Sequence, residues 1–204
     1  MMILFEADPQ PERNLLPYDG SVYYYGQIFP QTLADHYYQQ LLAQLAWEHD
    51  RAVIYGKTIH TKRKVAWYGD QPFQYTYSGV LKTAMPWTAP LEYIKQAVEA
   101  KSGATFNSCL CNLYHDGSEG MAWHSDAEKD LKKHGVIASV TFGARRKFGF
   151  KHKLNKQTVY LELAHGSLLT MQDQTQDYWM HRLPPTTKIK SPRINLTFRT
   201  IDRF

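Results

Sequence analysis

The chain has 204 residues, of which 43% are hydrophobic and 14% aromatic, and its formal net charge is +5. These values fit one compact domain with a sizeable core and exclude wholesale disorder. No apolar run approaches the roughly 18 residues of a membrane span, and the first residues lack the basic start of a secretory signal. We therefore expect no signal peptide, no transmembrane segment and no membrane partner.

Cysteine usage adds an expectation about the compartment. Cys109 and Cys111 are two residues apart, so on a strand they point the same way and are poorly placed for a disulfide. We expect reduced thiols, as in a cytoplasmic protein of a prokaryote or a nuclear protein of a eukaryote. Two cysteines alone also cannot form a structural zinc site.

The N-terminal segments predict a tail, a strand and a helix. Residues 1–20 contain three prolines and little periodicity, which predicts a loose N-terminal tail. Residues 22–25 predict a short strand. Residues 32–47 predict a helix with Thr32 as its cap. Its predicted inner face carries an apolar residue every fourth position: Leu33, Tyr37, Leu41 and Leu45.

Strands and a second helix follow. Residues 52–55 and 57–61 predict two strands joined at Gly56, and residues 64–68 predict a third. Residues 90–100 predict a helix, with Pro90 in its first turn, Gly103 past its end, and one apolar face made by Leu91, Ile94 and Val98.

From residue 105 the pattern becomes one of short β-rich runs separated by turn residues. No helical period of useful length is present there. Many short strands after an α/β beginning favour a sandwich, barrel or jelly roll. The predicted strands are 108–114, 136–142, 146–151, 158–163, 167–171, 177–182 and 193–201.

Two stretches are basic and contain no acid, residues 51–64 and 143–157. Aromatic residues are interleaved with the lysines and arginines. Such stretches suit the phosphate backbone of a nucleic acid. The alternative is a solvated lysine-rich surface, which is the usual meaning of one such run.

Three residues form a candidate metal-binding set. His124 and Asp126 are two positions apart, so on an extended segment both side chains reach the same side. His181 lies on a later predicted strand. Two imidazoles and one carboxylate are the ligands of the facial triad, which binds Fe(II) and leaves positions open for co-substrate and oxygen.

Residues 193–199 alternate between polar and apolar side chains. On a strand, Arg193, Asn195 and Arg199 point one way, with apolar residues on the other face. Two arginines inside a β core are costly unless they meet carboxylates, which a small dicarboxylate would supply. The alternative is a pair of surface arginines on an edge strand.

These motifs, taken together, resemble the AlkB family of Fe(II)/2-oxoglutarate-dependent dioxygenases over residues 22–204. The resemblance implies a mainly β fold, a double-stranded β-helix (jelly roll) of residues 106–204, preceded by an N-terminal α/β nucleotide-recognition lid of residues 21–105. It is strongest in N-L-Y-H-D-G (112–117), W-H-S-D-A-E (123–128), I-A-S-V-T-F-G-A (137–144), F-K-H-K (150–153), L-A-H-G-S-L-L-T-M (163–171), H-R-L-P (181–184) and P-R-I-N-L-T-F-R (192–199).

The resemblance also implies residue roles and cofactors. Fe(II) would be bound by His124, Asp126 and His181, with 2-oxoglutarate and O2 as co-substrates. Arg193 would pair with the distal carboxylate of 2-oxoglutarate, and Tyr114 would donate a hydrogen bond to the same end. The other predicted contacts to 2-oxoglutarate are Asn112 and Arg199, near the end that chelates iron, and Asn195 in the polar lining.

A finer resemblance connects R-K-V-A-W-Y-G-D (63–70) and Y-T-Y-S-G (75–79) to the branch containing AlkB homologue two, which repairs duplex DNA. It implies that Tyr75, Tyr77 and Ser78 hold a flipped base and that Glu128 reads its edge. It further implies an intercalating hairpin of Ile54, Tyr55 and Gly56, where the family has V-F-G, with Arg63 among the cations that hold the DNA backbones.

The implied function is oxidative demethylation of N-alkylated bases such as 1-methyladenine and 3-methylcytosine in DNA, with release of formaldehyde. The implied partner is double-stranded DNA with a flipped base, bound by a monomer. One alternative is the same chemistry on RNA or single-stranded DNA, which needs no wedge hairpin. Others are a 2-oxoglutarate oxygenase that acts on protein or lipid, and a non-catalytic nucleic-acid-binding module.

Overall fold

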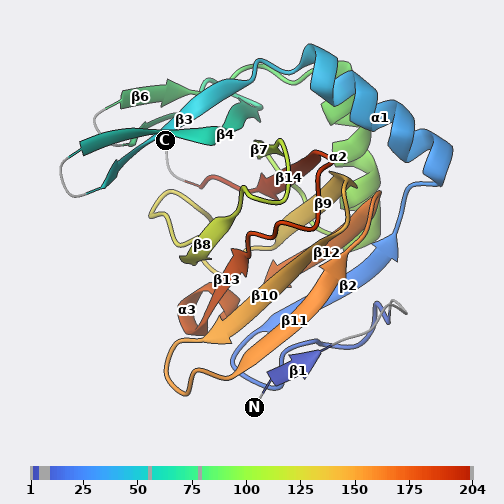
Figure 1. The fold of residues 1–204 in the computed structure, drawn as a ribbon, viewed down its shortest axis with the longest axis vertical. Helices are drawn as coiled ribbons and strands as arrows, with labels where there is room; N and C mark the ends of the chain where they lie inside the picture. The colour runs from blue at the N-terminus through green and yellow to red at the C-terminus, as the bar shows by residue number, and fades with distance from the viewer. Residues whose placement is uncertain (1, 5–9, 55–56, 78–79, 203–204) are drawn as a thin grey trace.

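The computed structural model describes residues 2–4, 10–54, 57–77 and 80–202. For some residues in the strands it describes the backbone alone. Two sheets face each other in a jelly-roll arrangement, which confirms the predicted mainly β fold (Figure 1). The smaller sheet has the strand order β1 (Met2–Leu4), β11 (Thr158–Leu163), β10 (Arg146–His152), β13 (Trp179–Leu183), β8 (Met121–His124). The larger sheet has the order β2 (Ser21–Gln27), β12 (Ser167–Gln172), β9 (Ile137–Gly143), β14 (Arg193–Arg199), β7 (Ser108–Tyr114), β4 (Lys57–Gly69), β3 (Glu48–Ile54).

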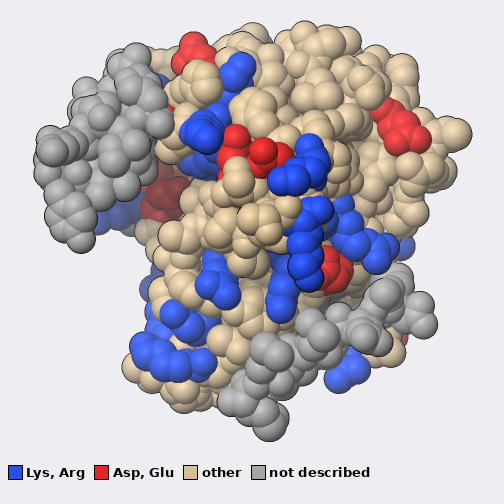
Figure 2. Space-filling view, in the orientation of Figure 1, with Lys and Arg blue, Asp and Glu red and all other residues tan. Residues whose placement is uncertain are grey.

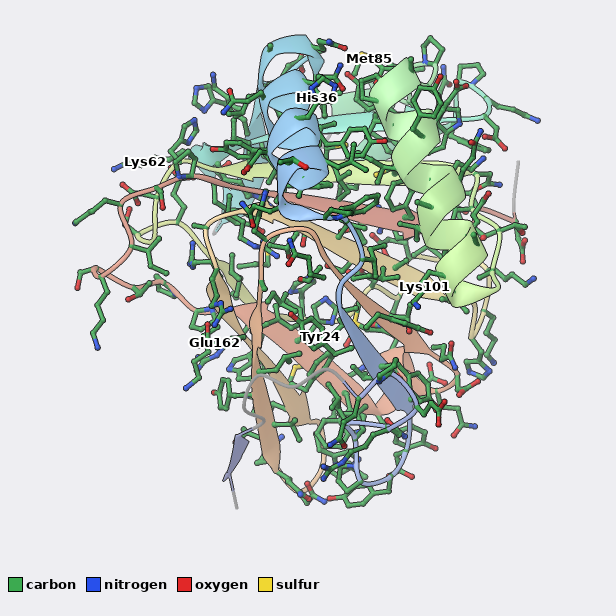
Figure 3. All side chains as sticks on the ribbon, turned by 90° about the vertical axis from the view of Figure 1, so that its right-hand side faces the viewer. Tyr24, His36, Lys62, Met85, Lys101 and Glu162 are labelled. Atoms are coloured by element: carbon green, nitrogen blue, oxygen red, sulfur yellow. The ribbon has the colours of Figure 1, made fainter. Side chains whose placement is uncertain are left out.

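Two helices, α1 (Gln31–Gln44) and α2 (Ala89–Ser102), lie over the outer face of the larger sheet (Figure 3). A hydrophobic core fills the space between them and the sheet. A second core fills the space between the two sheets. None of the helices among the described residues is long and apolar enough to cross a membrane.

The predicted first helix is confirmed, but two of its details are wrong. The helix begins at Gln31 directly after Pro30, and Thr32 makes no capping hydrogen bond. Leu33 is 38% exposed, whereas Ala34, Leu41 and Leu45 are buried. In the first turn Ala34 takes the inner position in place of Leu33 and lies so close to Gly166 that a Cβ added there would be 3.0 Å from the Ala34 Cβ.

The second helix agrees with its prediction. Leu91, Ile94 and Val98 are fully buried, and Pro90 stands in the first turn. Gly103 ends the helix with φ +71°, a left-handed conformation that glycine adopts without steric cost.

The prediction of a loose tail is wrong for residues 10–20. Leu15 and Leu16 are buried in the core between the sheets. The side chain of Asn14 fixes this segment, because its Oδ1 accepts hydrogen bonds from the backbone N–H groups of Leu16 and Val22. Upstream, β1 pairs in parallel with β11.

Several predicted strands have different bounds. The expected strands 57–61 and 64–68 form one continuous strand, β4, which pairs with β3 and β7. The expected strand 177–182 begins as one helical turn, α3 (Thr175–Tyr178), before β13. Strand β8, which carries His124 at its end, is too short to show a sequence period.

The segment expected to form a lid divides into two parts. Strand β2 pairs with β12, and α1 and α2 pack on the larger sheet, so all three belong to the jelly roll. Only the distal ends of β3 and β4 and the hairpin of β5 (Gln74–Tyr77) and β6 (Val80–Thr83) project from one end of it (Figure 1).

Strand β14 shows how the fold creates a polar interior. Ile194, Leu196 and Phe198 face the helices and are fully buried in that core. The alternate residues, beginning with Arg193 and Asn195, therefore face the space between the sheets. The predicted alternation is confirmed, and the polar face belongs to a central strand rather than to an edge.

Candidate active site

The three predicted metal ligands meet at one point. His124 ends β8 and is the register partner of His181 on β13, and Asp126 follows two residues after His124. The Oδ1 atom of Asp126 lies 3.6 Å from His124 Nε2 and 3.7 Å from His181 Nε2. One ligand atom from each residue lies within 4.8 Å of the others. Strand pairing thus produces the cluster that sequence spacing alone could not.

Neighbouring groups orient these ligands. His124 Nδ1 lies 2.8 Å from the carbonyl oxygen of Ala122 and donates to it, which leaves Nε2 with its lone pair toward Asp126. The backbone N–H of Asp126 donates to Gln176 Oε1, and Ser125 Oγ donates to the carbonyl of Trp179. Hydrogen bonds of this kind, made by the metal ligands and their neighbours to other groups of the protein, fix the orientation of the ligand side chains before a metal binds.

The electrostatics suit a divalent cation. Burial lowers the pKa of His181 to about 4, against the opposing charge of Asp126, so the imidazole is neutral at pH 7. Burial would raise the pKa of Asp126, but His181, Arg199 and His124 outweigh it and hold the pKa below its ordinary value. Imidazole nitrogens and an ionised carboxylate are the donor set of non-haem iron sites.

The predicted co-substrate residues other than Arg199 share a cavity of about 70 Å³ with the triad. Arg193 is 2% exposed, and no carboxylate among the described residues pairs with it. Burial lowers the pKa of its guanidinium to about 10. The residues of the cavity that the sequence predicts are Asn112, Tyr114, His124, Asp126, His181, Arg193 and Asn195.

Neutral groups hold Arg193 within the part of the chain that the structure describes. Its Nη2 donates to Thr141 Oγ1 at 2.8 Å and to Asn195 Oδ1 at 2.7 Å, and its Nε has no hydrogen-bond partner among these residues. Its Cζ lies 5.6 Å from the ring centroid of Tyr114. A buried cation without a counter-anion is costly, so a ligand that brings a carboxylate fits this pocket well.

Sequence reasoning missed two hydroxyls of β9, Ser139, which lines the cavity, and Thr141, which accepts from Arg193. Ser139 Oγ donates to Asn195 Oδ1 at 2.9 Å, so Asn195 is fixed from two sides. The register pairs Thr141 with Asn195 and Ser139 with Thr197. The alternation of small polar residues along β9 indicates that they share one face of the strand. Only the pairing with β14 shows that this face meets Asn195 and Arg193.

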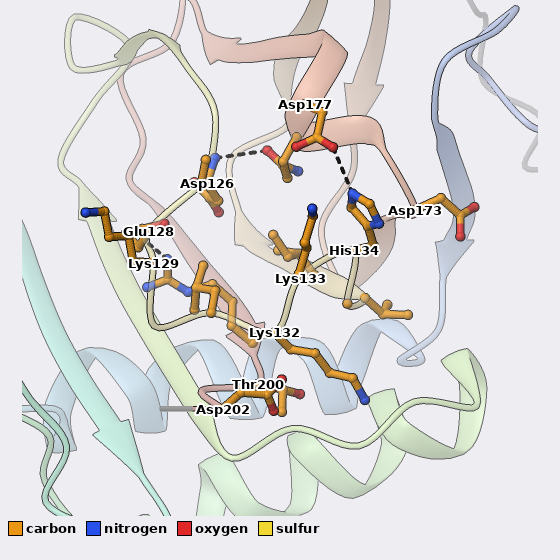
Figure 4. Close-up of a pocket in the computed structure, with 17 residues that line it drawn as sticks. Asp126, Glu128, Lys129, Lys132, Lys133, His134, Asp173, Asp177, Thr200 and Asp202 are labelled. Carbon is orange, nitrogen blue, oxygen red and sulfur yellow. Dashed lines mark hydrogen bonds and ion pairs between the residues drawn. The ribbon is translucent and has the colours of Figure 1, made fainter. Parts of the chain in front are cut away.

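Glu128 and Arg199 lie outside that cavity and pair with each other. Arg199 Nη1 donates to Glu128 Oε1 at 3.0 Å. Both residues line a second cavity of about 350 Å³. Figure 4 shows this cavity with Glu128, Lys129, Lys132 and Lys133 labelled among its lining residues. A third cavity of about 420 Å³ adjoins the same pair.

This third cavity has aromatic walls. Trp67 and Phe73 line it, as do Pro72 and Gln74, and it reaches Glu128 and Arg199. Strand β5, which carries Tyr75 and Tyr77, continues directly from Gln74. Tyr55, Gly56 and Ser78 lie outside the described residues, and Ile54 ends β3.

Arg63 lies at the inner end of the projecting strands. Its side chain is 11% exposed, and it donates from Nη2 to Asp50 Oδ2 and from Nη1 to Asn112 Oδ1. The predicted contact of Arg63 with a DNA backbone stays a prediction. Asp50 is a partner that the sequence did not indicate.

The second basic stretch contributes to a cationic face. Lys147 and Lys151 on β10 stand with Arg182 of β13 beside the rings of Tyr160 and Trp123, at distances of 4.3 to 5.7 Å. Figure 2 shows lysines and arginines gathered over the face on which this smaller sheet lies.

Arg146 belongs to the same stretch but is buried, with 1% of its surface exposed. It donates to the backbone carbonyls of Asp116, Gly117, Glu119 and Pro184. It therefore ties together the loops before β8 and after β13, which are the two strands that carry the histidine ligands.

The jelly roll, the His-Asp-His cluster and the buried arginine together define an oxygenase of the kind that uses iron and 2-oxoglutarate. The family model described as the 2OG-Fe(II) oxygenase superfamily matches residues 21–199. The chain belongs to this superfamily, whose members use Fe(II), 2-oxoglutarate and O2.

Curated relatives are more specific. DNA oxidative demethylase ALKBH2 from Homo sapiens is 39% identical over 188 residues, which cover 87% of this chain and 72% of that protein. Alpha-ketoglutarate-dependent dioxygenase alkB homolog 3 from Homo sapiens is 39% identical over 178 residues, which cover 82% of this chain and 62% of that protein. Because the two sequence identities are equal, they do not indicate which relative this chain resembles more.

Solved structures confirm the fold. An oxidoreductase of the 2OG-Fe(II) oxygenase family from Burkholderia pseudomallei has a TM-score of 0.59 at 12% identity, and covers 98% of this chain and 94% of its own. The structure of OsALKBH1 has a TM-score of 0.60 at 14% identity, and covers 91% of this chain and 99% of its own.

Proposed function

We propose that this protein is an oxidative demethylase of N-alkylated bases in DNA, with 1-methyladenine and 3-methylcytosine as substrates. The observation that carries the proposal is the shared cavity of the His-Asp-His cluster and Arg193, a buried cation that no carboxylate of the described residues pairs with. The 39% identity to proteins named DNA oxidative demethylase supports the choice of substrate class.

In this proposal His124, Asp126 and His181 bind Fe(II), and Arg193 binds the distal carboxylate of 2-oxoglutarate. Bound iron, 2-oxoglutarate and O2 would supply the oxidation, in which one oxygen atom goes to the N-methyl carbon and the other to succinate, with loss of carbon dioxide. The hydroxymethyl group would then leave as formaldehyde and restore the base. Asn195, Ser139 and Thr141 keep the guanidinium of Arg193 in place, so the co-substrate needs little reorganisation to bind.

The flipped base is proposed to lie beside Glu128, close to the aromatic-walled cavity. Glu128 is two residues from Asp126, and its side chain is 55% exposed although one oxygen accepts from Arg199. A carboxylate can accept a hydrogen bond from the exocyclic amino group of adenine or cytosine. Tyr75, Tyr77 and Ser78 are proposed to hold the ring from the side of the β5–β6 hairpin.

Duplex DNA is the proposed form of the substrate, bound by a monomer. The distal ends of β3 and β4 project from the jelly roll, and Tyr55 lies between these two strands in the sequence. A ring at such a tip fills the gap that a flipped base leaves. The same chemistry on single-stranded DNA or RNA is the second candidate, and it needs no wedge because a single strand leaves no gap to fill.

The test of the function is a coupled product measurement. Purified protein with Fe(II), 2-oxoglutarate and oxygen should release formaldehyde and succinate in equal amounts from an oligonucleotide that contains 1-methyladenine. The unmethylated oligonucleotide is the substrate control, and His181→Ala is the enzyme control. Succinate without formaldehyde on every methylated oligonucleotide would direct the search toward protein or lipid substrates.

A further inference from the structure

A buried acid on β3 holds two cations from different elements. Asp50 is 8% exposed. Its Oδ2 accepts from Arg63 Nη2 on β4 at 2.5 Å, and its Oδ1 accepts from Lys82 Nζ on β6 at 2.7 Å. Because its two oxygens accept from a cation on β4 and a cation on β6, this carboxylate joins β3 and β4 to the β5–β6 hairpin.

The same arginine reaches the cosubstrate cavity. Arg63 Nη1 donates to Asn112 Oδ1 at 2.7 Å, and Asn112 is 5% exposed and lines the cavity of Arg193. An asparagine amide can take two orientations that exchange its oxygen and nitrogen. The guanidinium selects the one in which Oδ1 faces Arg63. The amide nitrogen, which has no hydrogen-bond partner among the described residues, is then left to donate to an acceptor in the cavity.

We propose that Asp50 is a positioning residue that fixes Arg63, and through it the amide of Asn112, for 2-oxoglutarate, while it holds the β5–β6 hairpin by Lys82. The proposal deepens the proposed function, on which its nucleic-acid part rests. Asp50 does not line the cavity of Arg193 and the metal ligands, so the role we assign to it acts through Arg63 and Lys82.

The charges of Asp50, Arg63 and Lys82 and their geometry support this role. Arg63 and Asp50 have side chains that are each 11% exposed, and Lys82 is 24% exposed, so solvent screens the three charges only in part. Without the carboxylate, two cations of the same cluster would repel each other. Arg63 would be free to leave Asn112, and the amide would lose its fixed orientation. Removal of a residue that orients a ligand-binding side chain typically lowers the affinity for the ligand by about 10–100-fold.

The experiment measures 2-oxoglutarate binding without nucleic acid. Calorimetry with Mn(II) in place of iron gives the Kd of 2-oxoglutarate for the parent, Asp50→Asn, Asn112→Ala and the double variant. We expect Asp50→Asn to raise the Kd about 10-fold, within that range. We also expect Asp50→Asn to add less than twofold once Asn112 is already alanine, because residues that act through one contact are not additive.

Two further variants separate positioning from folding. Arg63→Lys keeps the charge but cannot bond Asp50 and Asn112 at once, so it should weaken 2-oxoglutarate binding as Asp50→Asn does. Lys82→Met leaves Arg63 and Asn112 in contact, so it should keep the Kd within twofold and instead raise the KM for a methylated oligonucleotide.

The outcomes are distinct. An unchanged Kd for both Asp50→Asn and Arg63→Lys, or additive losses in the double variant, would overturn the proposal. A lower Tm with an unchanged Kd would mean that Asp50 serves stability alone. If methylated oligonucleotides are not substrates, the proposed function fails while the calorimetric result for 2-oxoglutarate still stands or falls by itself.

Discussion

Glu128 and Arg199 are joined by a hydrogen bond of 3.0 Å between Oε1 and Nη1. The pair links the loop that carries Asp126 to the end of β14, the strand that begins at Arg193. Arg199 is the more buried partner, with 10% of its side chain exposed against 55% for Glu128. The arginine therefore anchors an acid that remains accessible beside the metal-ligand cluster.

The first prediction concerns Glu128. Glu128→Ala should lower kcat/KM on methylated oligonucleotides by about 10–100-fold, the loss of a hydrogen bond between a charged group and the base edge, worth roughly 1.5–3 kcal/mol. The Kd of 2-oxoglutarate should stay within twofold. Kinetics on 1-methyladenine and 3-methylcytosine check this, with Glu12→Ala, an exposed acid near the N-terminus, as the matched control. Equal activity of Glu128→Ala and the parent would remove Glu128 from base recognition.

The second prediction concerns the metal. His124→Ala, Asp126→Ala or His181→Ala should each abolish turnover, because two remaining ligands hold Fe(II) poorly. Chelation of the parent should have the same effect, reversed by added Fe(II). Activity is measured together with metal content, and circular dichroism checks the fold. Near-normal turnover of any of the three variants at verified metal content would contradict the assignment.

The third prediction concerns Arg193. Arg193→Ala should raise the Kd of 2-oxoglutarate by at least about 30-fold, since removal of one member of a buried charge pair costs roughly 2–5 kcal/mol. Calorimetry with Mn(II) in place of iron measures it. Arg145→Ala, which changes an exposed arginine, is the control. If 2-oxoglutarate binds both variants as it binds the parent, the buried arginine does not hold the co-substrate.

The fourth prediction concerns Arg146 and stability. Arg146→Ala leaves four backbone carbonyls without their donor, which should cost roughly 3 kcal/mol of unfolding free energy. For a chain of this size the Tm should fall by about 6–12 °C. Thermal unfolding checks this against Arg145→Ala, an exposed change expected to lie within about 0.5 kcal/mol of the parent. Equal Tm values for the two variants would show that the four contacts add nothing.

The fifth prediction concerns strand choice. Tyr55→Ala should lower kcat/KM on double-stranded substrate about 5–150-fold more than on single-stranded substrate, because base–aromatic stacking is worth roughly 1–3 kcal/mol and no gap forms in a single strand. Both substrates are measured at one salt concentration, since backbone contacts depend on salt. Equal losses on both would favour the single-strand or RNA alternative.

Local patterns predict the part of the site that lies on one strand. The alternation from Arg193 to Arg199 fixed which side chains share a face, because a period of two leaves no other arrangement. The metal ligands are different. His124 and His181 become neighbours only through the pairing of β8 with β13, which no spacing in the sequence reveals. Resemblance to a family supplied that link.

Long-range burial accounts for what sequence reasoning got wrong or missed. Leu15 and Leu16 lie in a proline-rich segment, and only the core between the sheets explains their burial. Arg146 lies in a basic stretch that predicts an exposed surface, yet the side-chain alternation of β10 makes this arginine buried. Asp50 belongs to no motif, and its role depends on two cations that lie 13 and 32 residues away.

The most direct test of the central claim is formaldehyde release from the same 1-methyladenine oligonucleotide, single-stranded and annealed to its complement, measured side by side. We predict that both forms release formaldehyde and that the release requires Fe(II) and 2-oxoglutarate. We also predict a kcat/KM on the duplex at least equal to that on the single strand. Formaldehyde from neither form, by protein that binds metal and 2-oxoglutarate, would contradict it.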